Sequence, residues 1–371
     1  SAHRGGRPEM RIGIGALAGI VGGPATYARE LVRALAREGR HDYIVFTDHP
    51  EAFAGAAVRV IHVPLASTYR QVTWDHMRLP ALIRRHEVAL YHGTKAVLPI
   101  RCAVPAVVTV HDLAVYACPE TFAWQQRAHF RLCVPPSVAR ARRIITVSEH
   151  ARGDVLARFG VRPERVVAIA NGVADTFGLP AAPGAIRRLR ERHGLGERLV
   201  ACVGTVQPRK HVERAIEAFG HAGGAARGWQ LVVAGRLRPG YVPAWTTSPP
   251  PGVRWLGALD DAELCALYAA APVFVSASEY EGFGLTVCEA MASGAAVVAV
   301  GTSAIPEVVG DAGLLVERSD PSLLAPAIAR LLGDDRLRTD LGTRARARAA
   351  RFTWDQAARR TREVYEEALA S

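Results

Sequence analysis

The chain has 371 residues, more than the roughly 250–300 at which one hydrophobic core stops growing, so two domains are expected. Its 49% hydrophobic and 22% charged residues exclude a disordered chain. The formal net charge of +11 can reflect a compositional bias of the source genome toward arginine codons, or it can serve to attract anionic substrates or an anionic membrane surface. No basic stretch is interleaved with aromatic residues, so a nucleic-acid partner is not expected.

The cysteines and the apolar runs indicate the compartment. The six cysteines form no C-x-x-C pair and no Cys/His cluster with metal-ligand spacing, which predicts free thiols in a reducing compartment. No apolar run approaches the ~18 residues of a membrane span, and the first residues lack the apolar block of a secretory signal. We therefore expect a cytoplasmic protein. Peripheral association with the inner membrane face is the alternative that the positive charge leaves open, and no oligomeric state is indicated.

In the first half of the chain, short apolar runs alternate with helical patterns. The expected strands are 11–15, 43–47, 58–63, 90–92, 106–111, 144–147 and 166–169. Gly22 and Gly23 precede a helix whose apolar positions recur from Tyr27 onward. Further helices are expected at 124–141 and 148–159. This alternation predicts a parallel sheet with helices on both faces.

Turn residues gather between Gly178 and Gly184, where we place the linker. Beyond it, strands are expected at 199–203, 229–234, 253–256, 273–276 and 295–300. Helices are expected at 211–220, 260–270 and 285–292. The sequence thus predicts an α/β fold of two doubly wound, Rossmann-like domains, residues 1–178 and 179–352, and a last helix in 353–371 that crosses back to the first domain.

The most informative segment, residues 276–294, runs from a short apolar strand through a glycine-containing loop into a helix. A helix N-terminus presents unpaired N–H groups and a positive dipole end, and both suit a phosphate. Glu281 lies in the loop and Glu289 in the helix, where carboxylates can accept hydrogen bonds from sugar hydroxyls. The spacing alone equally allows a solvated Glu281 and a Glu289 that interacts only with the helix dipole.

This segment resembles the retaining glycosyltransferases of family 4, which have the GT-B fold. Glu281 and Glu289 match the family's E-x7-E signature, within the words Glu-Gly-Phe-Gly-Leu and Glu-Ala-Met-Ala-Ser-Gly. The resemblance extends over nearly the whole chain through segments 108–113, 204–210, 257–264 and 306–310. It implies that Glu281 contacts the donor sugar and that Glu289 binds the ribose hydroxyls. It also implies that backbone groups near Phe283, Gly284 and Leu285 hold sugar and phosphate.

Lys210 is one of only two lysines in the chain and follows the strand 199–203 through a short loop. There it can aim a compact positive charge at a diphosphate leaving group, whose negative charge grows in the transition state. An exposed lysine at a helix start is the alternative. Many family members carry an Arg where this chain has Thr205. Arg209 is the candidate for this second cation, although neighbouring side chains at a helix start often point apart, and we expect Thr205, Arg209 and Lys210 to bind the donor.

The first domain offers candidates at the ends of three expected strands. The loop 15–23 ends in Gly22 and Gly23, which suits close approach of the backbone to a ligand, and the resemblance places such a loop against the donor phosphates and the acceptor. His111 alone indicates a structural hydrogen-bonding residue, but the resemblance implies that it touches the donor sugar beside the reacting carbon. Ser148 and Glu149 can line the acceptor side, and a simple helix cap is the alternative for Ser148.

We therefore expect a retaining, metal-independent hexosyltransferase that works in a cleft between the two domains, with His111, Lys210 and Glu281 as catalytic residues. Its partners are a nucleotide diphosphate sugar and a hydroxyl-bearing acceptor: a glycan, a lipid-linked sugar or a small natural product. No metal or other cofactor is expected. Because no nucleophile is evident, we expect a same-face mechanism, in which the leaving phosphate helps to deprotonate the acceptor hydroxyl. The alternatives are a GT-B sugar-nucleotide epimerase or phosphorylase, and a nucleotide-sugar-binding protein without turnover.

Overall fold

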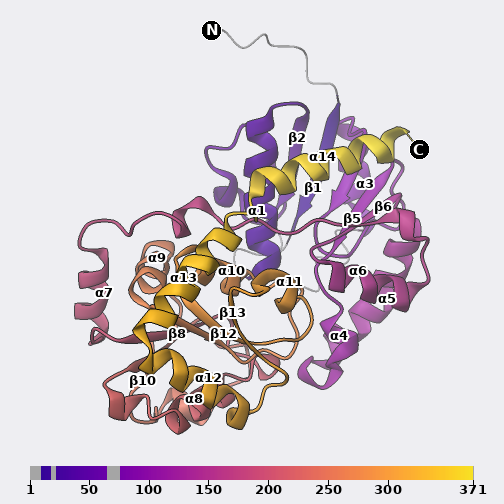
Figure 1. The fold of residues 1–371 in the computed structure, drawn as a ribbon. Coiled ribbons are helices and arrows are strands. Elements are labelled where there is room, and N and C mark those ends of the chain that lie inside the picture. The colour runs from indigo at the N-terminus through magenta and orange to yellow at the C-terminus, as the bar shows by residue number, and fades with distance from the viewer. Residues whose placement is uncertain (1–9, 18–21, 65–75, 371) are drawn as a thin grey trace. The chain divides into compact units, whose positions relative to one another are not determined.

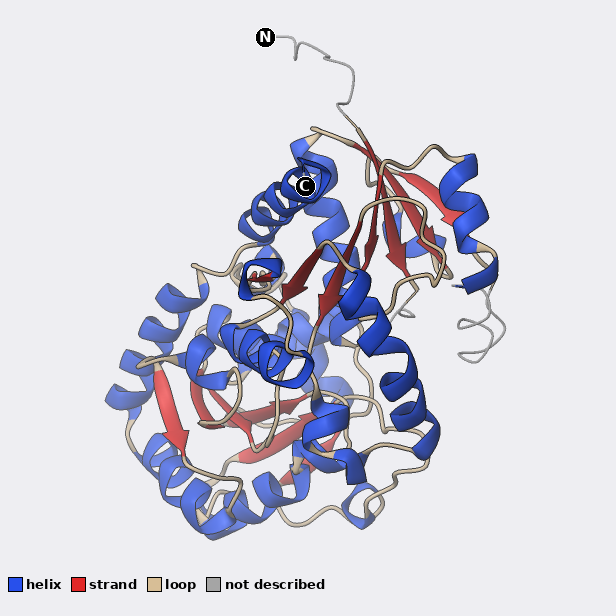
Figure 2. Cartoon of the chain, turned by 90° about the vertical axis from the view of Figure 1, so that its right-hand side faces the viewer, coloured by secondary structure: helices blue, strands red, loops and turns tan. Residues whose placement is uncertain are grey.

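The computed structural model describes residues 10–17, 22–64 and 76–370, and these form two compact units with a sheet each (Figure 1). The first unit joins residues 1–172 to 353–371, and the second consists of residues 173–352. Helices cover both faces of each sheet (Figure 2). None of the helices in the described part of the chain has the length and apolar character needed to cross a membrane.

The first unit is built on a seven-stranded parallel sheet with the order β3-β2-β1-β4-β5-β6-β7. Its strands are β1 (Arg11–Ala16), β2 (Asp42–Thr47), β3 (Arg59–His62), β4 (Leu90–Gly93), β5 (Ala106–Val110), β6 (Arg143–Thr146) and β7 (Val166–Ala168). Its helices are α1 (Gly23–Glu38), α3 (Leu79–Arg85), α4 (Ala114–Ala117), α5 (Trp124–Arg140), α6 (Glu149–Phe159) and α14 (Trp354–Ala370). The strand order reverses between β1 and β4, and open α/β sheets bind ligands outside the carboxyl ends of strands at such a point.

The last helix, α14, packs against α1 within the first unit, although the whole second unit separates the two in sequence. Its buried residues recur every three or four positions and so form one face of the helix. They are Trp354, Ala357, Ala358, Thr361, Val364, Tyr365 and Ala368. The end of the chain therefore contributes two large aromatic side chains to the interior of the first unit.

The second unit is built on a six-stranded parallel sheet with the order β10-β9-β8-β11-β12-β13. Its strands are β8 (Leu199–Val203), β9 (Gln230–Ala234), β10 (Val253–Trp255), β11 (Val273–Ser276), β12 (Ala296–Val300) and β13 (Gly313–Val316). Its helices are α7 (Ala185–His193), α8 (Val212–His221), α9 (Asp261–Ala270), α10 (Leu285–Ala292), α11 (Ile305–Val309), α12 (Pro321–Gly333) and α13 (Asp335–Ala349). Here the strand order reverses between β8 and β11, which places the expected ligand site at their carboxyl ends.

Besides the helices α3, α4, α7, α11 and α12, which were not among those expected, two further features of the fold differ from the sequence expectation. The short strand β13 was not expected; it pairs with β12 at the sheet edge and is only partly buried, so it carries too little periodic pattern to stand out. The units divide after Gly172 rather than after Gly178. The reason is a contact of the intervening turn: the Phe177 and Tyr268 rings pack in a T-shaped arrangement, with 5.4 Å between their centroids, so this turn belongs to the second unit.

Candidate active site

In the second unit, the loops that follow β8 and β11 meet at the carboxyl edge of the sheet. A Cβ atom built on Gly204 would lie 4.0 Å from Cγ2 of Thr286, so the backbone after β8 approaches the first turn of α10. A small hollow between these loops is lined by Cys202, Val203, Gly204, Thr205, Lys210, Val212, Val275, Ser276 and Ala277. The structure therefore brings Thr205 and Lys210 together at the edge where the fold predicts a ligand.

The N-terminal end of α10 depends on a glycine. Gly284 precedes the helix with φ 95°, and a Cβ atom there would come within 2.7 Å of Cδ1 of Ile305. The N–H groups of the first turn, beginning at Leu285, have no acceptor within the helix and leave a positive end. The Phe283 side chain is buried against Phe352, with ring centroids 5.5 Å apart, so only its backbone is available to a ligand.

Glu281 lies in the loop before α10 and is held by two cations. Lys210 Nζ donates to Glu281 Oε1, and Arg209 Nη1 lies 3.7 Å from Glu281 Oε2. Only 16% of the Lys210 side chain and 9% of the Glu281 side chain are exposed. The side chains of the neighbouring residues Arg209 and Lys210 thus converge on Glu281. That Arg209 serves as the second donor-binding cation stays a prediction.

Burial and charge act in opposite directions on this ion pair. Burial raises the pKa of the Glu281 carboxyl, but the charges of Lys210 and Arg209 outweigh it, and the pKa falls below the ordinary 4.5. For Lys210, burial lowers the pKa below the ordinary 10.5, and the Glu281 carboxylate opposes that shift. Glu281 is therefore a buried, ionised carboxylate that interacts with two cations, and it is not a solvated surface residue.

The backbone around Glu281 is fixed by hydrogen bonds from two other loops. The Glu281 N–H donates to Ser303 Oγ at 2.8 Å, and the Ala304 N–H donates to the Glu281 carbonyl at 3.3 Å. Arg209 ties the third loop in, because its guanidinium donates to the Tyr280 carbonyl. Ser303, which was not among the expected site residues, follows β12 and has a positive φ of 52°.

Glu289, eight positions further on, lies in the second turn of α10 and has a tyrosine partner. The Tyr268 hydroxyl donates to Glu289 Oε2 at 2.9 Å. Burial, followed by the nearby Glu289 charge, raises the pKa of Tyr268 well above the ordinary value, so Tyr268 stays a neutral donor. Tyr268 was not among the expected site residues, because its position in α9 resembles that of any other buried helix residue.

In the first unit, His111 follows β5 at the carboxyl edge of the sheet. Its Nε2–H donates to the Thr94 carbonyl at 2.8 Å, because a carbonyl can only accept. The neutral ring therefore keeps Nδ1 as its acceptor nitrogen. Burial lowers the pKa of His111, while the Thr94 carbonyl and Asp112 oppose the shift, so the neutral form dominates near pH 7.

The other candidates in the first unit occupy two helix starts. Gly22 is the N-cap of α1 with φ 96°, and both Gly22 and Gly23 are exposed, whereas residues 18–21 of their loop lie outside the described residues. Ser148 is nearly fully buried and caps α6, since its Oγ accepts from the Ala151 N–H at 3.0 Å. Glu149 is exposed, 3.7 Å from Arg152. Acceptor contact by Ser148 or Glu149 stays a prediction.

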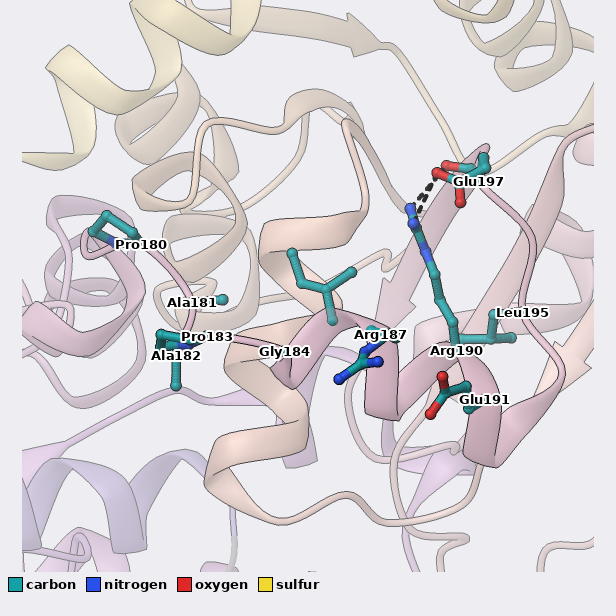
Figure 3. Close-up of a pocket in the computed structure, with 11 residues that line it drawn as sticks. Pro180, Ala181, Ala182, Pro183, Gly184, Arg187, Arg190, Glu191, Leu195 and Glu197 are labelled. Atoms are coloured by element: carbon teal, nitrogen blue, oxygen red, sulfur yellow. Dashed lines mark hydrogen bonds and ion pairs between the residues drawn. The ribbon is translucent and has the colours of Figure 1, made fainter.

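A separate pocket of about 760 Å³ runs along α7 and the loop before it (Figure 3). It is lined mainly by turn residues and by the ion pair of Arg190 with Glu197, 2.7 Å apart, and contains none of the candidate residues. In the described ranges, no three or more His, Cys, Asp or Glu side chains gather as metal ligands do.

Two protein families match this chain, one in each half. The family described as Glycosyltransferase Family 4 matches residues 21–177, and the family described as Glycosyl transferases group 1 matches residues 186–348. The second match includes Lys210, Glu281 and Glu289, and the first includes His111.

Curated relatives are similar over most of the chain. O-antigen chain mannosyltransferase B of Escherichia coli is 30% identical over 296 residues, which is 76% of this chain and 75% of the relative. MMP alpha-(1->4)-mannosyltransferase of Mycolicibacterium hassiacum is 29% identical over 409 aligned positions, covering 94% of this chain and 95% of the relative. Among solved structures, Anabaena HepE in complex with UDP-glucose superposes with a TM-score of 0.76 at 21% identity, covering 97% of this chain and all of that one.

Proposed function

This chain belongs to the family 4-like glycosyltransferases of the GT-B fold, and from this premise we propose that it transfers a hexose from a nucleoside diphosphate to an acceptor hydroxyl with retention of anomeric configuration. The observation that carries the proposal is the cation pair Lys210 and Arg209 on Glu281, in the loop that leads into α10. Fixed positive charge and unpaired helix N–H groups at one edge of a sheet are what a diphosphate requires.

Lys210 can bind the diphosphate without losing Glu281. An ammonium group has three N–H donors, so one can stay on the Glu281 carboxylate while others reach phosphate oxygens. As the bond to the sugar breaks, negative charge grows on the leaving phosphate and strengthens its interaction with Lys210. Glu281, which stays ionised, accepts a sugar hydroxyl near the anomeric carbon, where positive charge develops.

Glu289 is assigned to the ribose of the donor. A carboxylate has about four lone-pair sites, so Glu289 can accept ribose hydroxyls while it keeps the Tyr268 hydrogen bond. Tyr268 fixes the orientation of that carboxylate and lowers the conformational entropy lost when the donor binds. The ribose does not change during the reaction, so this contact contributes to binding and not to the chemical step.

His111 is assigned to the donor sugar. Its Nε2–H is used by the Thr94 carbonyl, which leaves Nδ1 to accept a hydrogen bond from a sugar hydroxyl. A neutral ring is required for this role, because protonated imidazole has no acceptor nitrogen. The lowered pKa of His111 keeps that form available.

The reaction that we propose needs no protein nucleophile. The bond between the anomeric carbon and the phosphate oxygen breaks, and the acceptor oxygen attacks the same face of the sugar. The acceptor proton passes to an oxygen of the leaving phosphate, so the products are the glycoside and the nucleoside diphosphate. Lys210 and the α10 N-terminus neutralise the leaving group, which is the role of Mg²⁺ in metal-dependent transferases.

The test is product formation from a panel of nucleotide sugars with UDP, GDP, ADP and dTDP, in which mannosyl donors come first because two relatives are named mannosyltransferases. We expect nucleoside diphosphate release that depends on acceptor, persists in EDTA, and gives a product with the donor's anomeric configuration by NMR. Inversion of the anomer, or a rate that EDTA abolishes and Mn²⁺ restores, would contradict the corresponding part of the proposal.

A further inference from the structure

A chain of four buried polar side chains crosses the interior of the first unit. The Tyr365 hydroxyl lies 2.7 Å from Nδ1 of His92, and Nε2 of His92 lies 2.7 Å from Oγ1 of Thr109. Thr109 Oγ1 in turn lies 2.9 Å from the Tyr27 hydroxyl. All four side chains are essentially inaccessible to solvent. These three hydrogen bonds therefore link α14 to α1 through β4 and β5.

These four groups stay neutral and must share their protons in an ordered way. Burial lowers the pKa of His92 to about 3, and it raises those of Tyr27 and Tyr365 above their ordinary values. A neutral imidazole has one N–H and one acceptor nitrogen, so the directions of the two His92 hydrogen bonds are linked: when one nitrogen accepts, the other donates. Loss of the Tyr365 hydroxyl therefore also acts on the hydrogen bond between His92 and Thr109.

The far end of this chain contacts the candidate catalytic histidine. The Tyr27 ring meets the His111 ring edge to face, with centroids 4.8 Å apart and an interplanar angle of 86°. His111 is otherwise held by the Thr94 carbonyl, and Thr94 is itself anchored because its Oγ1 donates to the Gly15 carbonyl at 2.6 Å. The His111 imidazole is thus held by two contacts: its Nε2–H donates to the Thr94 carbonyl, and its ring packs against the Tyr27 ring.

The position of these groups argues for a role beyond packing. His92 and Thr109 lie near the carboxyl ends of β4 and β5, beside the reversal of strand order where this fold binds ligands. A core built only for stability is better served there by apolar side chains, because buried polar groups must all be paired to avoid a desolvation penalty. A fully paired network fixes one arrangement of its members.

We propose that Tyr27, Thr109, His92 and Tyr365 form a positioning network that holds the His111 ring in the orientation required for sugar transfer. None of the four touches the substrate; they act through the ring contact of Tyr27 with His111. The kinetic part of this inference rests on the proposed function, whereas the structural part concerns the state of His111 alone. The two parts are therefore tested separately.

The structural test uses Tyr27→Phe, which keeps the ring and removes the hydroxyl, and Tyr365→Phe, which removes the hydroxyl at the end of the network opposite to His111. The imidazole signals of His111 are observed by ¹⁵N NMR of histidine-labelled protein and are assigned by their loss in His111→Gln. We expect both variants to change the ¹⁵N shifts or the exchange broadening of His111. Tyr43→Phe is the matched control, because Tyr43 is equally buried in this unit and its hydroxyl has no partner among the described residues. Unchanged His111 signals in both test variants overturn the inference, even if the enzyme is active.

The kinetic test asks whether the network acts through His111. We expect Tyr27→Phe and Tyr365→Phe to lower kcat about three- to tenfold with little change in donor KM, as small losses of orientation do. In a His111→Gln background, the same substitutions should have no further effect on kcat. Equal losses in both backgrounds identify a purely structural role and overturn the proposal. If no donor supports transfer by the unmodified protein, the proposed function fails, and the NMR result still decides the positioning.

Discussion

Around Glu281 in the second unit, charged side chains dominate, because the carboxylate lies between a lysine and an arginine. Around His111 in the first unit, the partners are a carbonyl, a tyrosine ring and a network of hydroxyls with a neutral imidazole. Both regions lie where the strand order of their sheet reverses. The topology of the fold therefore determines the location of each site, and its side chains determine the chemistry. The charged region suits a diphosphate, and the neutral region suits the uncharged sugar.

Loss of Lys210 should have the largest effect of any change in either region. Lys210→Ala removes the charge that we propose stabilises the leaving phosphate, and we expect kcat/KM to fall roughly 100- to 1,000-fold. The measurement is nucleoside diphosphate release with saturating acceptor. Arg336→Ala is the control, because Arg336 is an exposed cation of the same unit on α13. If Lys210→Ala retains more than a tenth of the activity, the assignment of the leaving-group cation is wrong.

Substitution of Glu281 comes next and separates chemistry from binding. Glu281→Gln keeps a hydrogen-bond acceptor for Lys210 and removes the carboxylate charge, and we expect kcat to fall about 10- to 100-fold. Affinity for the free nucleoside diphosphate, measured by calorimetry, should stay nearly unchanged. Glu281→Ala should give the same kinetic pattern and also lower the unfolding free energy by up to about 3–5 kcal/mol, since it leaves Lys210 buried without its carboxylate. Loss of nucleotide binding in Glu281→Gln would show that the donor lies elsewhere.

Substitution of Glu289 should have a smaller effect, confined to binding. Glu289→Ala removes the expected ribose contact, so nucleotide affinity and donor KM should weaken about tenfold while kcat changes little. Tyr268→Phe should follow in the same direction with a smaller change, because it removes only the group that orients Glu289. Calorimetric titration of both variants with one nucleotide measures this order. Unchanged affinity in Glu289→Ala would remove it from the donor site.

The local parts of both regions could be predicted from the sequence. The alternation of strands and helices, the loop into α10 with Glu281, and the position of Lys210 after β8 depend on residues close together in the chain, where turn chemistry and periodicity determine the structure. The partners that complete these positions could not. Tyr268 lies 21 residues from Glu289, and Tyr365 lies 273 residues from His92, so nothing in the local pattern marks either residue as a partner. Contacts of this kind appear only when the sheets are assembled.

The pH dependence of activity should show the mildest difference between the two regions. A histidine whose pKa is lowered by burial stays neutral further into acid, so its acceptor nitrogen is present above the ordinary value of 6.5 and is lost only as the pH falls below it. The Glu281 carboxyl, with its pKa below 4.5, stays ionised between pH 8 and 6.5. We therefore expect kcat/KM to be flat from about pH 8 down to 6.5 and then to decline with an apparent pKa below 6.5. His111→Gln should lose this acid limb, and His221→Gln, which changes an exposed histidine at the end of α8, should keep it. An apparent pKa at or above 6.5 that disappears in His111→Gln would mean that the protein does not hold His111 in its neutral form.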